Sequence, residues 1–458
     1  MELPAEFLSS LRDVKGFSGE AFIREHLNPG SVTSVRSNPY KSNSEFLSLI
    51  FPGIEKSAVP WCSTGFYLSS RPSFTLDPLF HAGCYYVQEA SSMFLEQVVK
   101  RAFPDHDQGG YRVLDLCAAP GGKTTHLSSL LPESLIVANE VIKTRVGIVA
   151  DNVTRWGKDN IVVTNNDAAD FHRFQGYFDL MVIDAPCSGS GLFRRDPESV
   201  KEWSPEHVML CSKRQQRIIR DSWSALKEDG VLLYSTCSYA VEENENILDW
   251  IADNFGVETI EVPGVADWGI VETVSSKHKM TGYRFYPDRL KGEGFFMTGM
   301  RKKTNSEENI PAGLRLERTS RREEEAIAPF LTNPEEYSGV RIREEIAAIR
   351  KDYFEELSRL MSVLYVKKAG IKLGKVIKDE LIPAHELAVN TAVNRFLPAL
   401  ELDYDAALQY LRKKDFFTEN AAKGWNVVRF KGYNLGWIKV LQNRINNYYP
   451  LSLRILKD

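Results

Sequence analysis

Two cysteines stand in short polar segments, each directly after an apolar run. Cys187 lies in Asp184-Ala-Pro-Cys-Ser-Gly-Ser-Gly, and Cys237 lies in Ser235-Thr-Cys-Ser-Tyr. An isolated cysteine is usually a small core residue, whereas nucleophilic thiolates occupy polar, partly exposed surroundings. Cys187 and Cys237 both stand in the polar surroundings that are typical of nucleophilic thiolates. We expect both thiols to face one cleft.

A loop with two adjacent glycines follows the apolar run 112–117. It reads Ala118-Ala-Pro-Gly-Gly-Lys123-Thr-Thr and leads into a segment of helical length. A strand, a glycine loop and a helix form a corner that binds anions and nucleotides, because the first N–H groups of the helix point at the ligand. A Walker A loop needs a glycine where Cys117 stands, and the dinucleotide pattern G-x-G-x-x-G is absent. A smaller nucleoside ligand, such as S-adenosylmethionine, remains as the candidate.

Three acidic residues stand at the ends of successive apolar runs: Glu140, Asp167 and Asp184. The carboxyl ends of parallel strands meet at one edge of a sheet, which is where such folds bind ligands. Glu140 follows Gly122 by 18 residues, a position from which a carboxylate can accept hydrogen bonds from ribose hydroxyls. The competing interpretation is that these acids cap helices or serve as loop residues.

A thiol beside a methyl donor suits methylation of a pyrimidine at carbon 5. That carbon is a weak nucleophile, and addition of a thiolate to carbon 6 turns the ring into an enamine that can attack a methyl sulfonium. A base then removes the proton from carbon 5, and the thiol leaves by elimination. An acid beside the ring nitrogen would assist the addition, and Asp184 is the candidate for that role.

These residues must be positioned by a regular alternation of strands and helices. Apolar runs at 112–117, 135–139, 160–164, 179–184 and 230–235 are separated by segments of helical length. This alternation predicts βαβ units with a parallel sheet covered on both faces, and the run 294–299 adds a late strand. The predicted fold class is α/β.

The 458 residues exceed one ordinary domain. We expect an N-terminal RNA-binding segment (1–105), a catalytic domain (106–302), a linker with a small intermediate domain (303–395) and a C-terminal module (396–458). Residues 320–363 are rich in charge and are expected to form helices with a solvated face. In the C-terminal module, basic residues alternate with aromatic ones, a composition that suits RNA. We expect about half of these aromatic residues to be core.

Candidate contacts to RNA are five basic residues. Arg194 and Arg195 follow the Cys187 loop, where we expect them at the rim of the cleft; the other three are Lys431, Lys439 and Arg444. The target base must leave its helix or loop to reach a deep cysteine, at a cost of a few kcal/mol.

Composition excludes several classes of protein. The net charge of 57 minus 61, or −4, excludes a uniformly basic protein but leaves room for a local basic patch. No apolar run reaches the 18 or so residues of a membrane span, and the N-terminus lacks the pattern of a signal peptide. We therefore expect a cytoplasmic protein without a membrane partner. We also expect a monomer, because no segment suggests a dimerisation element. The six cysteines contain no C-x-x-C pair, so no metal site is expected, and Cys62, Cys84 and Cys211 are expected in the core.

Three motifs in order resemble the Nop/Sun (Fmu) family of RNA cytosine-5 methyltransferases. They are Leu114-Asp-Leu-Cys-Ala-Ala-Pro-Gly-Gly-Lys-Thr, Asp184-Ala-Pro-Cys-Ser-Gly-Ser-Gly and Ser235-Thr-Cys-Ser-Tyr-Ala-Val-Glu-Glu-Asn-Glu. The resemblance covers about 81–296, and the overall layout is similar to bacterial RsmF-type enzymes with a C-terminal PUA-like module. One departure is Arg284-Phe-Tyr-Pro-Asp288, where many relatives have histidine after the proline.

The resemblance implies a class I S-adenosylmethionine-dependent methyltransferase domain with a Rossmann-like fold. It implies Cys237 as the nucleophile, Cys187 as the thiol that assists release of the methylated RNA, and Asp184 between cofactor and base. Glu140 would hold the ribose and Asp167 would lie at the adenine. The methionine part of the cofactor would contact the loop residues Cys117, Ala118, Ala119, Pro120, Gly121, Gly122 and Lys123.

The implied substrate is 16S ribosomal RNA, or the 30S subunit, and transfer RNA is the alternative within the family. Two functions of other classes remain at this point. One is an RNA-binding ribosome assembly factor without catalysis, against which the presence of both cysteines argues. The other is a P-loop nucleotidase, against which the missing first glycine argues.

Overall fold

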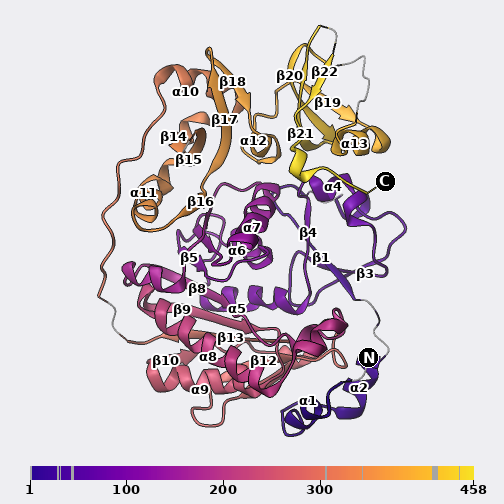
Figure 1. The fold of residues 1–458 in the computed structure, drawn as a ribbon, viewed down its shortest axis with the longest axis vertical. Helices are drawn as coiled ribbons and strands as arrows, with labels where there is room; N and C mark the ends of the chain where they lie inside the picture. The colour runs from indigo at the N-terminus through magenta and orange to yellow at the C-terminus, as the bar shows by residue number, and fades with distance from the viewer. Residues whose placement is uncertain are drawn as a thin grey trace.

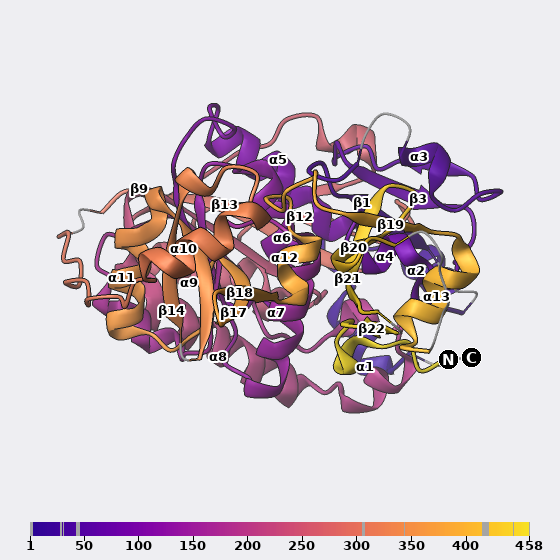
Figure 2. The same cartoon turned by 90° about the horizontal axis from the view of Figure 1, so that it is seen from above.

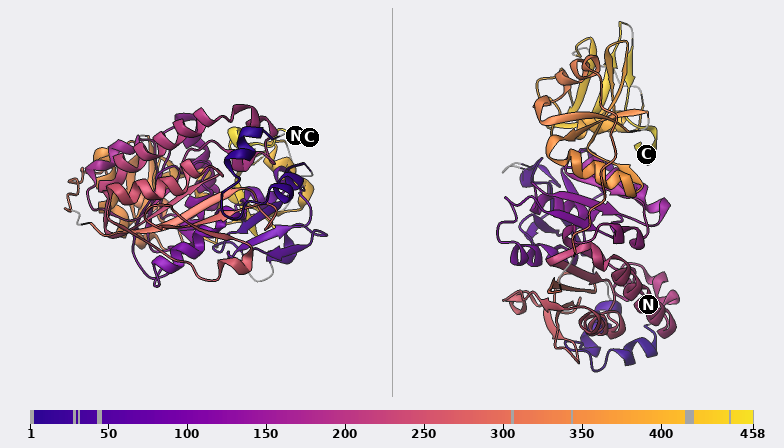
Figure 3. Two further views of the ribbon diagram at one scale, coloured as in Figure 1. Left: turned by 90° about the horizontal axis from the view of Figure 1, so that it is seen from below. Right: turned by 90° about the vertical axis from the view of Figure 1, so that its left-hand side faces the viewer.

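The computed structural model describes residues 3–27, 30, 32–42, 46–304, 307–342, 344–414, 421–442 and 444–457. The chain is arranged in tiers along its longest axis (Figure 1 and the right-hand view of Figure 3). The large central sheet lies in the middle, the C-terminal elements lie at one end, and the first two helices lie at the other. No helix in the described part of the chain is both long and apolar enough to cross a lipid bilayer.

A parallel sheet forms the centre of the molecule and confirms the predicted α/β fold. Its strands run in the order β9-β8-β5-β6-β7, and each overlaps one of the predicted runs. The strands are β5 (Arg112–Asp115), β6 (Leu135–Asn139), β7 (Ile161–Thr164), β8 (Phe178–Asp184) and β9 (Leu226–Thr236).

Antiparallel strands extend the sheet beyond β9. The predicted late strand is β13 (Phe295–Lys302), which pairs antiparallel with β9. Beyond it lie β12 (Thr281–Phe285) and β11 (Val271–Val274), and β10 (Val257–Thr259) also pairs with β13.

Helices cover both faces of this sheet, because successive side chains of each strand point to opposite faces. Val113 joins the core under one set of helices, and its neighbour Leu114 joins the core under the other. The first set is α5 (Leu95–Ala102), α6 (Gly122–Leu130) and α7 (Lys143–Trp156). The second set is α8 (Pro205–Ser222) and α9 (Glu245–Asn254). Figure 3 shows the two layers from below.

The N-terminal region divides between two places. Helices α1 (Ala5–Ser10) and α2 (Gly19–Leu27) contribute Phe7 and Phe22 to a core with Phe193 and Tyr239 of the catalytic region. An antiparallel sheet of order β2-β3-β1-β4 follows. Its elements, with the helices between them, are β1 (Thr33–Ser37), α3 (Phe46–Leu49), β2 (Lys56–Ala58), β3 (Gly65–Leu68), α4 (Pro78–His81) and β4 (Tyr85–Val87).

The charged stretch 320–363 is not helical throughout, and this prediction was wrong in its middle. Helices α10 (Arg321–Ile327) and α11 (Phe354–Val363) flank an antiparallel pair, β14 (Tyr337–Ile342) and β15 (Glu345–Arg350). In β15 the run of small and apolar residues 346–349 is buried, while charged residues stand at its ends. Burial of this run on a sheet overrides the helical propensity of its alanines and of the adjoining Glu345.

The intermediate region also joins the catalytic sheet. Strand β16 (Val366–Lys368) pairs antiparallel with β7. The remaining elements are β17 (Ile371–Ile377), β18 (Glu380–Pro383) and α12 (His385–Val389).

The C-terminal module is a sheet of order β19-β20-β21-β22 with one helix. Its elements are β19 (Ala399–Leu402), α13 (Tyr404–Leu411), β20 (Gly424–Phe430), β21 (Tyr433–Val440) and β22 (Ile445–Asn447). Trp437 and Tyr449 are buried, whereas Tyr448 is exposed. The module shares one hydrophobic core with the N-terminal sheet, in which Leu408 and Val35 both take part. Figure 2 shows the two regions side by side.

Candidate active site

A cavity of about 460 Å³ lies at the carboxyl edge of the central sheet. Its wall is formed by residues that follow β5, β6, β7, β8 and β9, together with α8. Ligand cavities of this size at this edge are typical of α/β proteins. Seven residues predicted from the sequence line it: Cys117, Ala119, Glu140, Asp167, Asp184, Cys187 and Cys237.

The two predicted cysteines are in direct contact. The Sγ atoms of Cys187 and Cys237 lie 3.0 Å apart. The pKa of the Cys187 thiol is raised, first by its hydrogen bond with Cys237 and then by burial. The Cys187 thiol therefore keeps its proton beside the sulfur of Cys237.

A buried carboxylate holds the two cysteine loops together. Glu243 accepts hydrogen bonds from the backbone N–H and hydroxyl of Ser188 and from the hydroxyl of Ser238 at 2.6 Å. Gln215 of α8 donates to the same carboxylate at 3.0 Å. Burial raises the pKa of Glu243. Ser188 and Ser238, which follow the two cysteines, are thus both held by Glu243. The sequence analysis predicted no role for Glu243, although this residue stands in the motif that begins at Ser235.

Asp184 occupies the last position of β8 and is about one-third exposed to the cavity. Its carboxylate accepts a hydrogen bond from the Ser235 hydroxyl at 2.7 Å, and the Lys123 ammonium lies 2.8 Å away. Lys123 thus connects the glycine loop to Asp184, although Lys123 itself does not line the cavity.

The glycine loop turns sharply into α6. Gly121 has φ of +110°, a left-handed conformation that favours glycine, and it precedes the first residue of the helix. Thr124 in the first turn donates to the Asp115 carboxylate at 2.6 Å, which ties the helix to β5. Asp115 is fully buried, and burial raises its pKa to about 7. Of the predicted loop residues, Cys117 and Ala119 line the cavity; Ala118, Pro120, Gly121 and Gly122 form the turn behind them.

Glu140 and Asp167 lie at different parts of the same wall. The Glu140 carboxylate accepts from the N–H groups of Ile142 at 2.9 Å and Ala119 at 3.3 Å. A carboxylate offers about four acceptor positions, so Glu140 keeps acceptor capacity for a ligand. Asp167 caps a 3₁₀ helix by accepting from Ala169. The helix-capping interpretation therefore holds for Asp167, but it does not remove this side chain from the cavity.

Arginines from two helices line the cavity and were missed by the sequence analysis. They are Arg145 of α7 and Arg214 and Arg217 of α8. Arg145 donates to the carbonyl oxygen of Ala119 at 3.1 Å, and Arg217 lies 3.7 Å from Asp167. No motif marks them, because each stands in an ordinary charged helix face.

The structure corrects the placement of Arg194. Its side chain is buried, donates to the carbonyl oxygens of Gly292 and Gly30, and lies 3.8 Å from Glu293. A guanidinium held this way fixes the loop to its neighbours and is not available at the rim. Arg195 is exposed instead.

The three basic residues predicted in the C-terminal module differ in their surroundings. Lys439 lies 2.9 Å from Glu380 of the intermediate region and above the ring of Trp425. Lys431 is exposed and donates to the carbonyl oxygen of Leu49 at 3.4 Å. Arg444 is exposed. As RNA contacts these residues stay a prediction.

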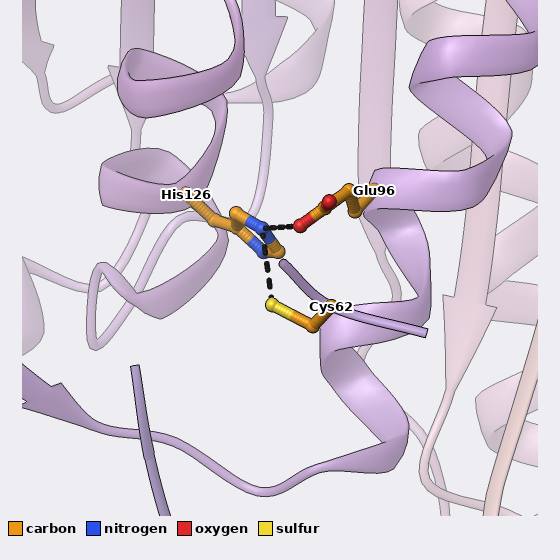
Figure 4. Close-up of side chains that lie close together, drawn as sticks. All are labelled: Cys62, Glu96 and His126. Atoms are coloured by element: carbon orange, nitrogen blue, oxygen red, sulfur yellow. Dashed lines mark hydrogen bonds and ion pairs between the residues drawn. The ribbon is translucent and has the colours of Figure 1, made fainter. Parts of the chain in front are cut away.

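A second group of titratable residues lies away from the cavity, between the N-terminal sheet and α6. Cys62, Glu96 and His126 are buried with their ligand-type atoms within 4.8 Å of one another (Figure 4). Glu96 already accepts from Ser63 N–H and lies 2.6 Å from Lys100, besides its 3.2 Å contact to His126. Since an ammonium already neutralises this carboxylate, a metal ion would have to displace it, and the group is best explained as a hydrogen-bonded core cluster.

Comparison with known proteins gives matches over most of the chain. The family model described as 16S rRNA methyltransferase RsmB/F matches residues 104–301. The N-terminal domain of 16S rRNA methyltransferase RsmF matches residues 3–90, and the methyltransferase RsmF PUA domain matches residues 397–455. These matches confirm the resemblance and the C-terminal PUA-like module.

Relatives of similar length come from Vibrio and Aliivibrio species. A ribosomal RNA small subunit methyltransferase F from Vibrio campbellii is 31% identical over 98% of this chain and 97% of its own. One of that name from Aliivibrio salmonicida is 32% identical over 86% of this chain and 85% of its own.

Solved structures agree with this assignment. A methyltransferase homologue from Pyrococcus horikoshii is 29% identical, with a TM-score of 0.52 over 66% of this chain and 100% of its own. NSun6 from Pyrococcus horikoshii with SFG is 20% identical, with a TM-score of 0.54 over 66% of this chain and 99% of its own, and it supports the fold. This chain is a methyltransferase that belongs to the ribosomal RNA small subunit methyltransferase F family.

Proposed function

We propose that this chain methylates carbon 5 of a cytosine in 16S ribosomal RNA, with Cys237 as the nucleophile. The observation that carries the proposal is the contact between the Cys187 and Cys237 thiols at 3.0 Å. Both line the cavity that also contains Cys117 and Ala119 of the glycine loop. A pair of thiols beside a nucleotide-binding loop suits covalent activation of a pyrimidine better than a direct transfer.

The residues around the cavity fit S-adenosylmethionine. Glu140 keeps free acceptor positions for ribose hydroxyls, Asp167 stands farther along the wall, and the loop 117–123 leads into the start of α6. When bound, S-adenosylmethionine supplies an electrophilic methyl group on a sulfonium. In this proposal Glu140 orients the ribose, Asp167 lies at the adenine, and Asp184 stands between cofactor and base.

The chemistry of the chain then runs through the two thiols. The Cys237 thiolate forms a bond to carbon 6 of the cytosine, and the electron pair of the 5,6 double bond makes carbon 5 nucleophilic. Asp184 shares a proton with the ring nitrogen and so offsets the charge that builds on the ring. After carbon 5 has gained the methyl group, a base takes the proton from carbon 5, the 5,6 double bond re-forms, and Cys237 leaves carbon 6 as a thiolate.

Cys187 assists that last stage. Its raised pKa keeps a proton beside the Cys237 sulfur, so a proton is at hand when the thiolate leaves carbon 6. Removing this thiol should leave bond formation possible and slow the release of RNA.

The substrate is inferred from the relatives, whose names place them on ribosomal RNA of the small subunit, and from the RsmF-type PUA domain at 397–455. Transfer RNA stays as the alternative. Since the cavity lies at the end of the sheet, the target base must turn out of its stack, at a cost of a few kcal/mol.

The test is to incubate Cys187→Ala with radiolabelled S-adenosylmethionine and 30S subunits, naked 16S rRNA or total tRNA, and to run denaturing gels. We expect a labelled protein–RNA adduct with one substrate, and no adduct with the Cys187→Ala, Cys237→Ala double variant. Cys84→Ala, which removes a buried cysteine outside the cavity, is the control and should transfer label without an adduct.

Other results would contradict parts of the proposal. Label transfer by Cys237→Ala would overturn the role of Cys237. An adduct on tRNA alone would replace the substrate. Failure of the wild-type protein to label any of the three RNAs would refute the proposed reaction.

A further inference from the structure

A second cavity, of about 300 Å³, lies between the N-terminal sheet and helix α7. Three arginines from separate parts of the chain line it: Arg71 before α4, Arg155 in α7, and Arg195 after the Cys187 loop. Aromatic side chains form much of the remaining wall, among them Phe80 and Tyr86. We call this the arginine cavity.

None of the residues that line the arginine cavity is acidic. Within the described part of the chain, no carboxylate lies within 4 Å of Arg71, Arg155 or Arg195. Two of the guanidiniums instead stack on rings, Arg155 over Phe80 at 4.3 Å and Arg71 over Phe74 at 5.3 Å. Three cations that converge without an acidic partner create a strong attraction for an anion.

Arg155 is the clearest example of a cavity arginine that has no carboxylate among the described residues in contact with it. Its guanidinium donates to the Asn152 side chain at 3.0 Å, and burial lowers its pKa. Charges shielded from water are usually paired, but Arg155 is half-buried and interacts with Asp151 of its own helix only at longer range. Asp151 is exposed and does not line the cavity, so a bound anion would supply a partner in direct contact.

The arginine cavity shares a wall with the cofactor loop. Asn152 donates to the carbonyl oxygen of Pro120 at 2.8 Å. Tyr86 packs so closely against Gly122 that a Cβ atom there would lie 3.2 Å from its ring. The arginine cavity therefore lies beside the glycine loop, and its Arg195 follows the segment that carries Cys187.

From this arrangement we infer that the arginine cavity binds a nucleotide of the substrate RNA next to the target cytosine, by arginine contacts to its phosphate. Exposed aromatic faces and guanidinium planes are also the surfaces on which unpaired bases stack. This inference rests on the proposed function, since it assumes an RNA substrate in the neighbouring cavity. In this inference Arg195 contacts the RNA phosphate, whereas the buried Arg194 holds its loop to Gly30 and Gly292.

The test compares Arg71→Ala, Arg195→Ala and the double variant with the wild-type protein. Both arginines are exposed, so folding should be retained, and thermal unfolding checks this. The control is Arg318→Ala, which removes an equally exposed arginine stacked on Phe354 at 4.4 Å, outside both cavities. The probe is the RNA that the wild-type protein methylates, with affinity followed by fluorescence anisotropy from low to high salt.

Each lost phosphate contact should reduce the slope of log affinity against log salt by about 0.7, so the double variant should lose about 1.4. KM for RNA should rise about tenfold or more in the double variant, while kcat and the affinity for S-adenosylmethionine stay unchanged. Slopes and KM equal to those of Arg318→Ala would overturn the inference, as would a fall in kcat with unchanged KM. Binding of a free nucleoside monophosphate that is lost in the double variant, while the affinity for RNA is unchanged, would reassign the cavity to a small ligand. If the wild-type protein itself transfers no methyl group to RNA, the proposed function fails first.

Discussion

The ion pair between Arg284 and Glu245 offers a sharp test of how the nucleophile loop is held. Both side chains are buried, with the Arg284 Nε atom 2.6 Å from Glu245 Oε1 and its Nη1 atom donating to the carbonyl oxygen of Tyr239 at 2.8 Å. Tyr239 stands two residues after Cys237. Arg284 thus links α9 to the segment that carries the thiol.

Replacing Arg284 by methionine removes the cation but leaves Glu245 buried. Loss of one partner of a buried pair costs about 3–5 kcal/mol, because the remaining charge has no partner. Replacing both residues by methionine removes the uncompensated charge, so we expect the double variant to recover most of that loss. The carbonyl oxygen of Tyr239 would still lack its donor, which leaves a residual cost of about 1–3 kcal/mol.

The assay is urea unfolding of the wild-type protein, Arg284→Met, Glu245→Met and the double variant, followed by methyl transfer under single-turnover conditions. We expect Arg284→Met to be the least stable, and the double-mutant cycle to give a coupling of several kcal/mol. A cost below about 1 kcal/mol for Arg284→Met would refute the reasoning. The reasoning would also be refuted if the double variant lost as much unfolding free energy as the two single variants together.

Three further predictions concern other buried groups. Glu243→Gln should lower the rate of methyl transfer by about tenfold to a hundredfold with little change in KM for RNA, because both cysteine loops lose a common anchor; Glu242→Gln is the control, and equal rates for the two variants would contradict the role of Glu243. His26 and His126 are buried, and burial lowers the pKa of each to about 4. Since the unfolded chain takes up these protons first, each histidine should remove about 1 kcal/mol of stability between pH 7.5 and 5.5, and unfolding curves that do not shift over this range would refute the assignment. Burial raises the pKa of Cys62 to about 12, so the native protein at pH 8 should leave Cys62 unmodified by iodoacetamide; peptide mass mapping checks this, with denatured protein as the control.

The sequence predicted the central sheet well because its strands are buried on both faces and read as continuous apolar runs. The same topology brought the strand-end residues Glu140, Asp184 and Cys187 to one edge, so the candidate site could be assembled without coordinates. The strands β14 and β15 were missed, because they stand in a stretch rich in glutamate and arginine, a composition that indicates helix until a partner sheet buries the strands.

Contacts between distant segments could not be predicted from one sequence. The burial of Arg194 depends on carbonyl oxygens of Gly30 and Gly292, and nothing in the local sequence marks them as partners. The same holds for the arginine cavity, whose walls come from three regions of the chain, and for Arg217, which approaches Asp167 from α8.

The core shared by the N-terminal sheet and the C-terminal module has a consequence for how the chain is made. Val35 and Leu68 share one core with Leu408 and Val428, and the ribosome produces Leu408 and Val428 after the whole catalytic region. Because a chain folds as it emerges, the catalytic sheet can form while the first sheet still has an open apolar side. That side is covered only after β19 to β22 have been synthesised. A chain truncated before β19 would therefore expose an apolar surface that chaperones and proteases recognise.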